Sequence, residues 1–193
     1  MRLYVAITGA SGAIYAVRLL ARLLRADVEV LLSISPMGCR LLKRELDIEV
    51  NLRDFDGEAL LEAASSLTYH HFQDLAAPPA SGSAPLDGMV VVPCSMGRLA
   101  RIAAGTATDL IDRAADVCLK EGRKLVLVPR ETPLSLIHLR NMQRLAEAGA
   151  TILPASPAFY HRPEGIEALV DTVIERIMAH LGVADEDAKR WTG

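Results

Sequence analysis

Two charged residues, Arg130 and Glu131, directly follow an apolar run at residues 124–128. Adjacent residues at the end of a strand point in different directions, so these side chains cannot easily form a surface ion pair with each other. We therefore expect separate roles for them. The planar guanidinium of Arg130 suits a phosphate group, and the carboxylate of Glu131 suits proton transfer.

A second candidate site is the run of small residues TGASGA at positions 8–13. Small side chains let a phosphate approach the backbone, and a helix that begins there offers free N–H groups. A GxxG turn can equally serve only to pack a helix on a strand. Dinucleotide sites use GxGxxG with an acidic residue after the second strand, whereas here that strand ends in Ser33 and Ser35. The pattern disfavours a nicotinamide cofactor and favours a mononucleotide.

A third candidate is the polar turn PCSMGR at residues 93–98. Ser95 has three readings: a helix N-cap, a hydrogen-bond donor to a ligand, or a nucleophile. The nucleophile is the least favoured of these, because the GxSxG frame is absent and no motif supplies a His or Asp partner. We expect Cys94 to be a small buried residue rather than a catalytic thiolate.

Three further cations lie in expected helices: Arg113 and Lys120, seven residues apart on one face of residues 110–121, and Arg176 beside the apolar stripe of the last helix. Most such side chains are solvated, so ligand contact is only one reading of them. The acidic run at 185–187 lacks the DDxxD pattern of magnesium sites and is expected to be solvated. No metal-ligand spacing is present among the histidines, His70, His71, His138, His161 and His180.

The elements that must position these residues alternate between short apolar strands and helices. A single doubly wound α/β domain over residues 1–193, Rossmann-like and flavodoxin-like, with helices on both faces of a parallel sheet, fits this rhythm. Ligands of such sheets bind outside the carboxyl ends of the strands. Residues 65–72 are ambiguous. The expected strands are 3–8, 28–33, 89–92, 124–128 and 151–153, and the expected helices are 14–24, one from Pro36, 99–104, 110–121, 132–149 and 166–181.

Composition excludes several classes of protein. The 193 residues carry 21 Lys plus Arg against 24 Asp plus Glu, a net charge of −3 that argues against nucleic-acid binding. Polar and glycine residues interrupt the apolar stretch 3–17, which disfavours a signal peptide, and no run reaches the roughly 20 residues that span a bilayer. We therefore expect a cytoplasmic protein that binds no membrane. The three cysteines have no CxxC spacing, so neither disulfides nor a metal site is expected.

Five segments together resemble the UbiX-type flavin prenyltransferases, which were formerly described as aromatic-acid decarboxylases. The segments are TGASGAIYAVRLL, PPASGSAP, PCSMGRLARIAAG, LIDRAADVCLKEGRKLVLVPRETPLSLIHLRNM and GATILPASPAFYHRP. The resemblance implies transfer of a dimethylallyl group from dimethylallyl phosphate to N5 and C6 of reduced FMN, without a metal. The product, prenylated FMN, would serve UbiD-type decarboxylases, for example in ubiquinone biosynthesis. The family also implies a homo-oligomer, a dodecamer with sites between subunits.

The resemblance assigns roles residue by residue. It implies acid/base chemistry at Glu131, with Ser11, Tyr160 and Lys120 also at the reacting centre. Arg113 and Glu45 match polar positions at a subunit boundary, so the helical face of Glu45 is expected in a neighbour's site. The allylic phosphate would be bound by Tyr160, Arg176, Lys120, Arg113 and Glu45, and the flavin by Gly9, Ala10, Ser11, Ser35, Ser95, Met96, Gly97, Arg98 and Arg130.

Three residues depart from the family pattern: Arg98 replaces a Thr or Ser beside the flavin, Gly122 interrupts a KERR run, and Leu75 replaces a frequent Trp near the prenyl pocket. They bear on the pocket's shape and on the choice between a phosphate and a diphosphate donor. Two other functions stay open. A non-catalytic FMN carrier would have no use for a second anion site. A flavin-dependent cysteine decarboxylase would carry PASANT and an early active-site His, whereas this chain has Pro79-Ala80-Ser81-Gly82-Ser83 and no His before residue 70.

Overall fold

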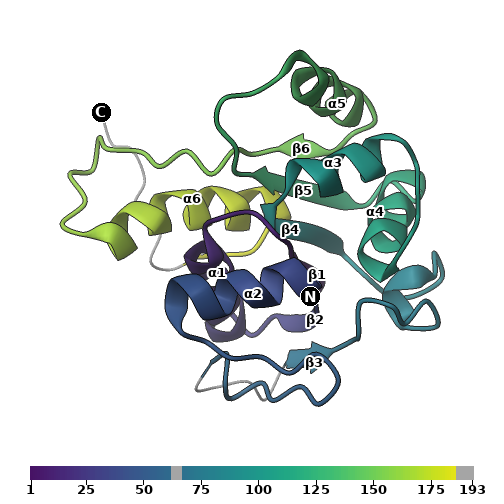
Figure 1. The fold of residues 1–193 in the computed structure, drawn as a ribbon, viewed down its shortest axis with the longest axis horizontal. Helices are drawn as coiled ribbons and strands as arrows, with labels where there is room; N and C mark the ends of the chain where they lie inside the picture. The colour runs from purple at the N-terminus through teal and green to yellow at the C-terminus, as the bar shows by residue number, and fades with distance from the viewer. Residues whose placement is uncertain (62–66, 186–193) are drawn as a thin grey trace.

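Apolar segments of the chain pair into a parallel six-stranded sheet with the order β3-β2-β1-β4-β5-β6 (Figure 1). The computed structural model describes residues 1–61 and 67–185. Successive strands run outward in both directions from the β1–β4 pair, which confirms the predicted doubly wound arrangement. The strands are β1 (Arg2–Ile7), β2 (Glu29–Ile34), β3 (Leu67–Tyr69), β4 (Gly88–Cys94), β5 (Lys124–Pro129) and β6 (Thr151–Ile152).

Helices cover both faces of this sheet, as predicted (Figure 1). One face is covered by α1 (Ala13–Arg25), α2 (Pro36–Leu46) and α6 (Ile166–Leu181). The other is covered by α3 (Met96–Ala103), α4 (Leu110–Lys120) and α5 (Leu136–Glu147), with a short 3-10 helix, η1 (Pro78–Ala80), against α4. None of the described helices is long and apolar enough to cross a membrane.

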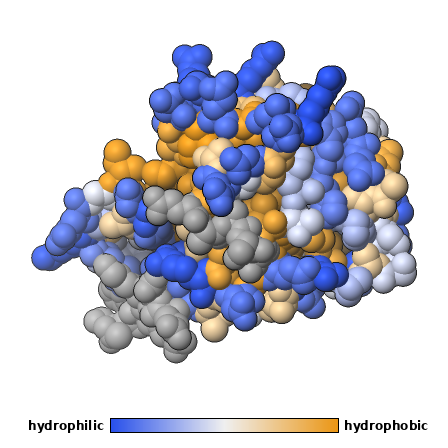
Figure 2. Space-filling model, turned by 90° about the horizontal axis from the view of Figure 1, so that it is seen from below, coloured by the Kyte–Doolittle hydropathy of each residue, from blue (hydrophilic) through white to orange (hydrophobic). Residues whose placement is uncertain are grey.

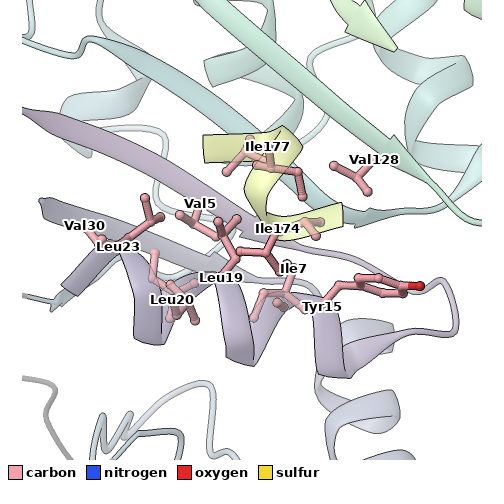
Figure 3. Packing of buried hydrophobic residues seen from close by; sticks show 14 of the residues in the cluster. Val5, Ile7, Tyr15, Leu19, Leu20, Leu23, Val30, Val128, Ile174 and Ile177 are labelled. Carbon is pink, nitrogen blue, oxygen red and sulfur yellow. The ribbon is translucent and has the colours of Figure 1, made fainter. Parts of the chain in front are cut away.

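Strand β1 shows why its sequence is apolar throughout. Val5 and Ile7 point into the layer under α1 and α6, while Tyr4 and Ala6 point into the layer under α3 and α4. Figure 3 shows the first of these layers, where Val5 and Ile7 lie close to Leu19 of α1. Because side chains from Leu3 to Ile7 alternate between two buried faces, the polar residue of the strand is confined to its first position, Arg2.

The helix that we expected from Thr132 begins later, at Leu136, and that prediction is wrong at its N-terminus. Ser135 caps it: its hydroxyl accepts a hydrogen bond from the backbone N–H of His138 at 3.2 Å. The His138 Nδ1 in turn accepts from the Ser135 N–H, which completes a capping box. The cap lies three residues past Thr132, so the charged segment 130–134 remains a loop at the sheet edge.

Other helix and strand boundaries differ from the predicted ones, and each difference has a local cause. Strand β4 extends to Cys94 because it pairs with Pro129 of β5 after an irregularity in register. The helix expected from residue 99 begins at Met96, since Ser95 provides its cap. Of the ambiguous segment 65–72, residues 67–69 are a strand, and residues 65 and 66 lie outside the described part, as do 186 and 187 of the acidic run.

Candidate functional site

The strand order reverses between β1 and β4, and a single buried hydroxyl joins the two strand ends. The hydroxyl of Thr8 donates to the carbonyl oxygen of Pro93 at 2.7 Å, and it accepts from the backbone N–H of Ser95 at 2.9 Å. Thr8 is 1% exposed. The loops that follow β1 and β4 are therefore held side by side at the edge where doubly wound sheets bind ligands.

Glycines allow the close packing of the loop after β1. A Cβ at Gly9 would come 2.5 Å from the Cβ of Met37 in α2, which is too close for any side chain. Gly12 has a φ of 114°, in the left-handed region that favours glycine. The glycines allow close packing of the helix, which supports the packing interpretation of the GxxG turn. The turn also lies at the carboxyl edge of the sheet, where an anion could bind, and that interpretation stays a prediction.

Glu45 of α2 completes the N-terminus of α1. Gly12, the N-cap, has no side chain that could accept a hydrogen bond. The carboxylate of Glu45 takes this place, accepting from the backbone N–H groups of Gly12 at 2.9 Å and Ala13 at 2.7 Å. Our expectation that this face serves a neighbouring subunit's site stays a prediction, and within one chain the structure shows a second role for the carboxylate. The carboxylate binds its own chain, because the α1 N-terminus needs an acceptor there.

The electrostatics of Glu45 follow from these contacts. Partial desolvation raises the pKa of the carboxyl, but hydrogen bonds from Ala13, Gly12 and the Ser11 side chain, together with the charge of Arg130, outweigh it. The net pKa lies below the ordinary value of 4.5. Glu45 is therefore an anion at neutral pH, placed next to Ser11 and within the field of Arg130.

Arg130 and Glu131 take different partners, as their position at the end of β5 predicted. Arg130 Nε donates to the carbonyl oxygen of Ser11 at 3.0 Å, which ties the end of β5 to the loop after β1. The Glu131 carboxylate accepts from the N–H of Thr132 at 3.1 Å. Both side chains are exposed at the carboxyl edge. The guanidinium retains donors for an anion, and the carboxylate retains an oxygen for a proton.

Ser35 and Ser95 are both helix N-caps. The Ser35 hydroxyl accepts from the N–H of Gly38 at 3.1 Å, and the Ser95 hydroxyl accepts from the N–H of Arg98 at 3.2 Å. The N-cap reading of Ser95 is confirmed, while the ligand contact stays a prediction. A Cβ on Gly97 would meet no described atom within 4 Å, so the first turn of α3 has open space in front of it. Helix starts of this kind bind phosphate.

The side chain of Arg98 points away from this edge into the protein. It is 3% exposed, and its Nη1 lies 2.5 Å from Asp109 Oδ1 and 2.6 Å from Asp112 Oδ1. The second oxygen of Asp112 accepts from Arg101 and Thr108. The guanidinium predicted to bind the flavin instead joins α3 to the start of α4, since two buried carboxylates need its charge. Only the backbone of Arg98 lies at the expected turn.

Lys120 lies away from the Arg130 edge, and Arg113 is bound within its own chain. Lys120 ends α4 just before β5 begins and pairs with Glu121, whereas Arg130 follows the other end of β5. Six residues of strand separate the two edges by about 20 Å. Arg113 Nε donates to the carbonyl oxygen of Ala80 at 3.1 Å. One chain therefore does not bring Lys120 to Glu131.

Tyr160 and Arg176 belong to the C-terminal part of the chain, which extends beside the sheet (Figure 1). Tyr160 lies in the segment between β6 and α6, is 58% exposed, and has its ring 4.3 Å from that of His161. Arg176 is exposed on α6. Both side chains can therefore reach a ligand or another chain.

No group of three or more His, Cys, Asp or Glu residues in the described ranges, 1–61 and 67–185, could hold a metal ion. Cys94 is fully buried, and burial raises the pKa of its thiol to about 12. The prediction of a small buried residue is confirmed, because a thiol with that pKa is not a thiolate at neutral pH.

The family model described as Flavoprotein matches residues 1–178. A flavin prenyltransferase UbiX from Synechocystis is 45% identical over 197 residues, covering 99% of this chain and 96% of its own. The solved structure of AnUbiX (PadA1) in complex with FMN and dimethylallyl pyrophosphate is 44% identical, with a TM-score of 0.90, covering 100% of this chain and 97% of its own. A dodecameric FMN-dependent UbiX-like decarboxylase from Escherichia coli O157:H7 is 42% identical, with a TM-score of 0.88 and complete coverage of both chains.

Proposed function

Because this chain belongs to the Flavoprotein family and, within it, to the UbiX-type flavin prenyltransferases, we propose that it transfers a dimethylallyl group from dimethylallyl phosphate to N5 and C6 of reduced FMN. The observation that carries the proposal is the meeting of Ser11 and the Arg130 guanidinium at the carboxyl edge of the sheet, beside the open first turn of α3. The chain that carries them matches flavin prenyltransferases over nearly its full length.

The residues at this edge fit a flavin mononucleotide. The phosphate suits the open first turn of α3 and the hydroxyl-capped start of α2. Arg130 supplies a guanidinium at the end of β5, and Gly9, Ala10 and Ser11 present a backbone with small side chains. Reduced FMN supplies the nucleophilic N5 and C6 when bound. Prenylated FMN leaves as the product.

The reaction needs stabilisation of a leaving phosphate and movement of protons. Phosphate carries about −1.5 to −2 charges, and Lys120, Arg176 and the Tyr160 hydroxyl can bind it as the C–O bond breaks. Formation of the N5–C bond as the allylic C–O bond breaks would release the proton of N5, which the departing phosphate can take. Bond formation at C6 would remove a proton from that carbon and add one to the alkene, so protons balance. Glu131 takes the acid/base role, because it is the exposed carboxylate that follows β5. Ser11 lies near Glu131, because the carbonyl oxygen of Ser11 accepts a hydrogen bond from Arg130, the residue before Glu131.

Lys120 completes this site only if a neighbouring subunit supplies it. It lies away from the edge of its own chain that carries Glu131, and Arg113 is proposed at the same subunit boundary. Large apolar side chains are exposed, and Figure 2 shows an apolar area between charged residues on one face. We propose a homo-oligomer, a dodecamer like that of the E. coli relative. Four of the exposed large hydrophobic residues lie in α5 and the loop before it: Leu134, Leu136, Ile137 and Leu139.

One experiment tests the activity directly. Purified protein is incubated anaerobically with reduced FMN and dimethylallyl phosphate, and the flavin is weighed by mass spectrometry. The proposal expects the mass of one added dimethylallyl unit, and a parallel incubation with dimethylallyl diphosphate identifies the donor. Tight FMN binding with an unchanged flavin mass would instead indicate a carrier. Delivery to a UbiD-type decarboxylase, and a cytoplasmic location, stay predictions.

A further inference from the structure

The segment between β6 and α6, residues 153–165, is held to α6 by a side chain that the sequence did not suggest. The hydroxyl of Thr172 accepts a hydrogen bond from the backbone N–H of Ala158 at 3.0 Å. The same hydroxyl donates to the carbonyl oxygen of Leu169 at 2.7 Å. The hydroxyl donates its only proton to the Leu169 carbonyl within the helix. Its oxygen therefore acts as the acceptor for the Ala158 N–H.

This hydrogen bond sets the spacing between two residues of the proposed phosphate site. Thr172 and Arg176 are four residues apart on α6, so their side chains share a face about 6 Å apart. Tyr160 lies two residues beyond Ala158. The bond therefore fixes Ala158 about one helical turn from Arg176, and the backbone that continues from Ala158 carries Tyr160.

The helix itself is anchored to α1 beside the same point. Arg18 binds both oxygens of Asp171, at 2.6 and 2.7 Å, and one oxygen of Glu167 at 2.7 Å. Helix α1 begins directly after the Ser11–Gly12 turn. Tyr160 is thus connected through Thr172, α6 and α1 to the loop of the proposed flavin site.

We propose that Thr172 is a positioning residue that holds Tyr160 and Arg176 at the spacing required for the leaving phosphate of the prenyl donor. This rests on the proposed function. Thr172 itself need not contact the donor. Its hydroxyl acts by orienting the segment, so its loss weakens binding of dimethylallyl phosphate and leaves FMN binding intact.

The test compares Thr172→Val, which keeps the side chain's shape but removes both hydrogen bonds, with Thr172→Ser, which keeps them. In the FMN-loaded enzyme, Thr172→Val should raise the KM for dimethylallyl phosphate by about 3- to 10-fold, the effect of one neutral hydrogen bond. Thr172→Ser should restore the wild-type value. Thr68→Val, on exposed residue 68 of β3, is the matched control and should change nothing.

Two measurements separate positioning from general destabilisation. The FMN dissociation constant and the melting temperature of Thr172→Val should match the wild type, while hydrogen exchange at the Ala158 amide should become faster. An unchanged KM in Thr172→Val, an equal loss in Thr172→Ser, or a parallel loss of FMN affinity would overturn the proposal.

Failure of the proposed function would look different. In that case the wild-type protein itself would leave the flavin mass unchanged. Calorimetric titration of dimethylallyl phosphate into the FMN-loaded wild type and Thr172→Val proteins still decides the role of Thr172. Equal binding by the two, or no binding by either, refutes it.

Discussion

The two halves of the proposed site are built differently. On the flavin side, hydrogen bonds within one chain join β1, β4, β5 and α2, and a buried ion cluster fixes α3. On the phosphate side, Tyr160 and Arg176 are exposed and Lys120 lies at the far end of β5. The difference teaches that one chain can preorganise the flavin site but needs other contacts to complete the phosphate site.

The largest effect is expected at the ion cluster of the flavin side. Arg98→Met removes the cation that Asp109 and the buried Asp112 share, and leaves Arg101 and Thr108 on the other oxygen of Asp112. We expect a loss of about 3 kcal/mol in the free energy of unfolding, measured with urea, the lower end of the range for a broken buried ion pair because Arg101 remains. The double variant Arg98→Met/Asp112→Leu should recover much of the lost free energy of unfolding. If Arg98→Met instead lost FMN affinity at unchanged stability, the guanidinium would belong to the ligand site after all.

Glu131→Gln tests the chemistry that both halves serve. The amide keeps the size of the carboxylate but cannot accept a proton, so prenylation should slow by about 10²-fold or more. FMN binding should be retained, because the Glu131 carboxylate accepts its hydrogen bond from its neighbour Thr132 and not from a loop of the flavin side. Single-turnover formation of prenylated FMN gives the rate. Turnover equal to the wild type would remove Glu131 from the mechanism.

Arg176→Ala should affect the two halves unequally. It removes a cation from the phosphate side and leaves the loops of the flavin side in place. We expect dimethylallyl phosphate to bind about 10-fold more weakly or worse, with little change for FMN, in parallel calorimetric titrations. Arg140→Ala, an exposed arginine on α5, provides the control. Equal losses for both ligands would contradict the division into two halves.

The smallest effect concerns the cap of α1. Glu45→Gln should cost about 0.5–1 kcal/mol of stability at pH 7, as for other helix caps. Because the folded pKa of Glu45 lies below 4.5, its contribution is present above pH 4.5 and is lost as the pH falls through the folded pKa. The stability difference between the wild type and the variant, measured from pH 7 to pH 3, should shrink below pH 4.5. A constant difference would show that the charge is not involved.

The sheet was predictable because most strand residues are buried on both faces and therefore apolar. The turn residues at the strand ends, Ser11, Ser95 and Arg130, lie at one edge as predicted, and ligand binding there stays a prediction. Hydrophobic periodicity and motif matching do not predict which residues the charged end of a long side chain contacts. Arg98 was assigned to the flavin by position, but Asp109 and Asp112 bind its guanidinium from another helix.

Partners from distant parts of the sequence account for the other surprises. Glu45 caps a helix that begins 32 residues earlier, and the one signal for it was that Gly12 cannot cap its own helix. Thr172 and Ala158 carry no motif at all. Helix α5 begins three residues later than expected because Ser135 caps it rather than Thr132, and both residue types make good caps.

The Thr8 hydroxyl has one more consequence. It ties together the loops that follow two neighbouring strands, which lie about 4.8 Å apart in a sheet. Both loops therefore keep one position relative to each other whatever side chains the surface carries. Attempts to make the protein accept longer isoprenoids should start in residues 153–165, which lie outside the sheet.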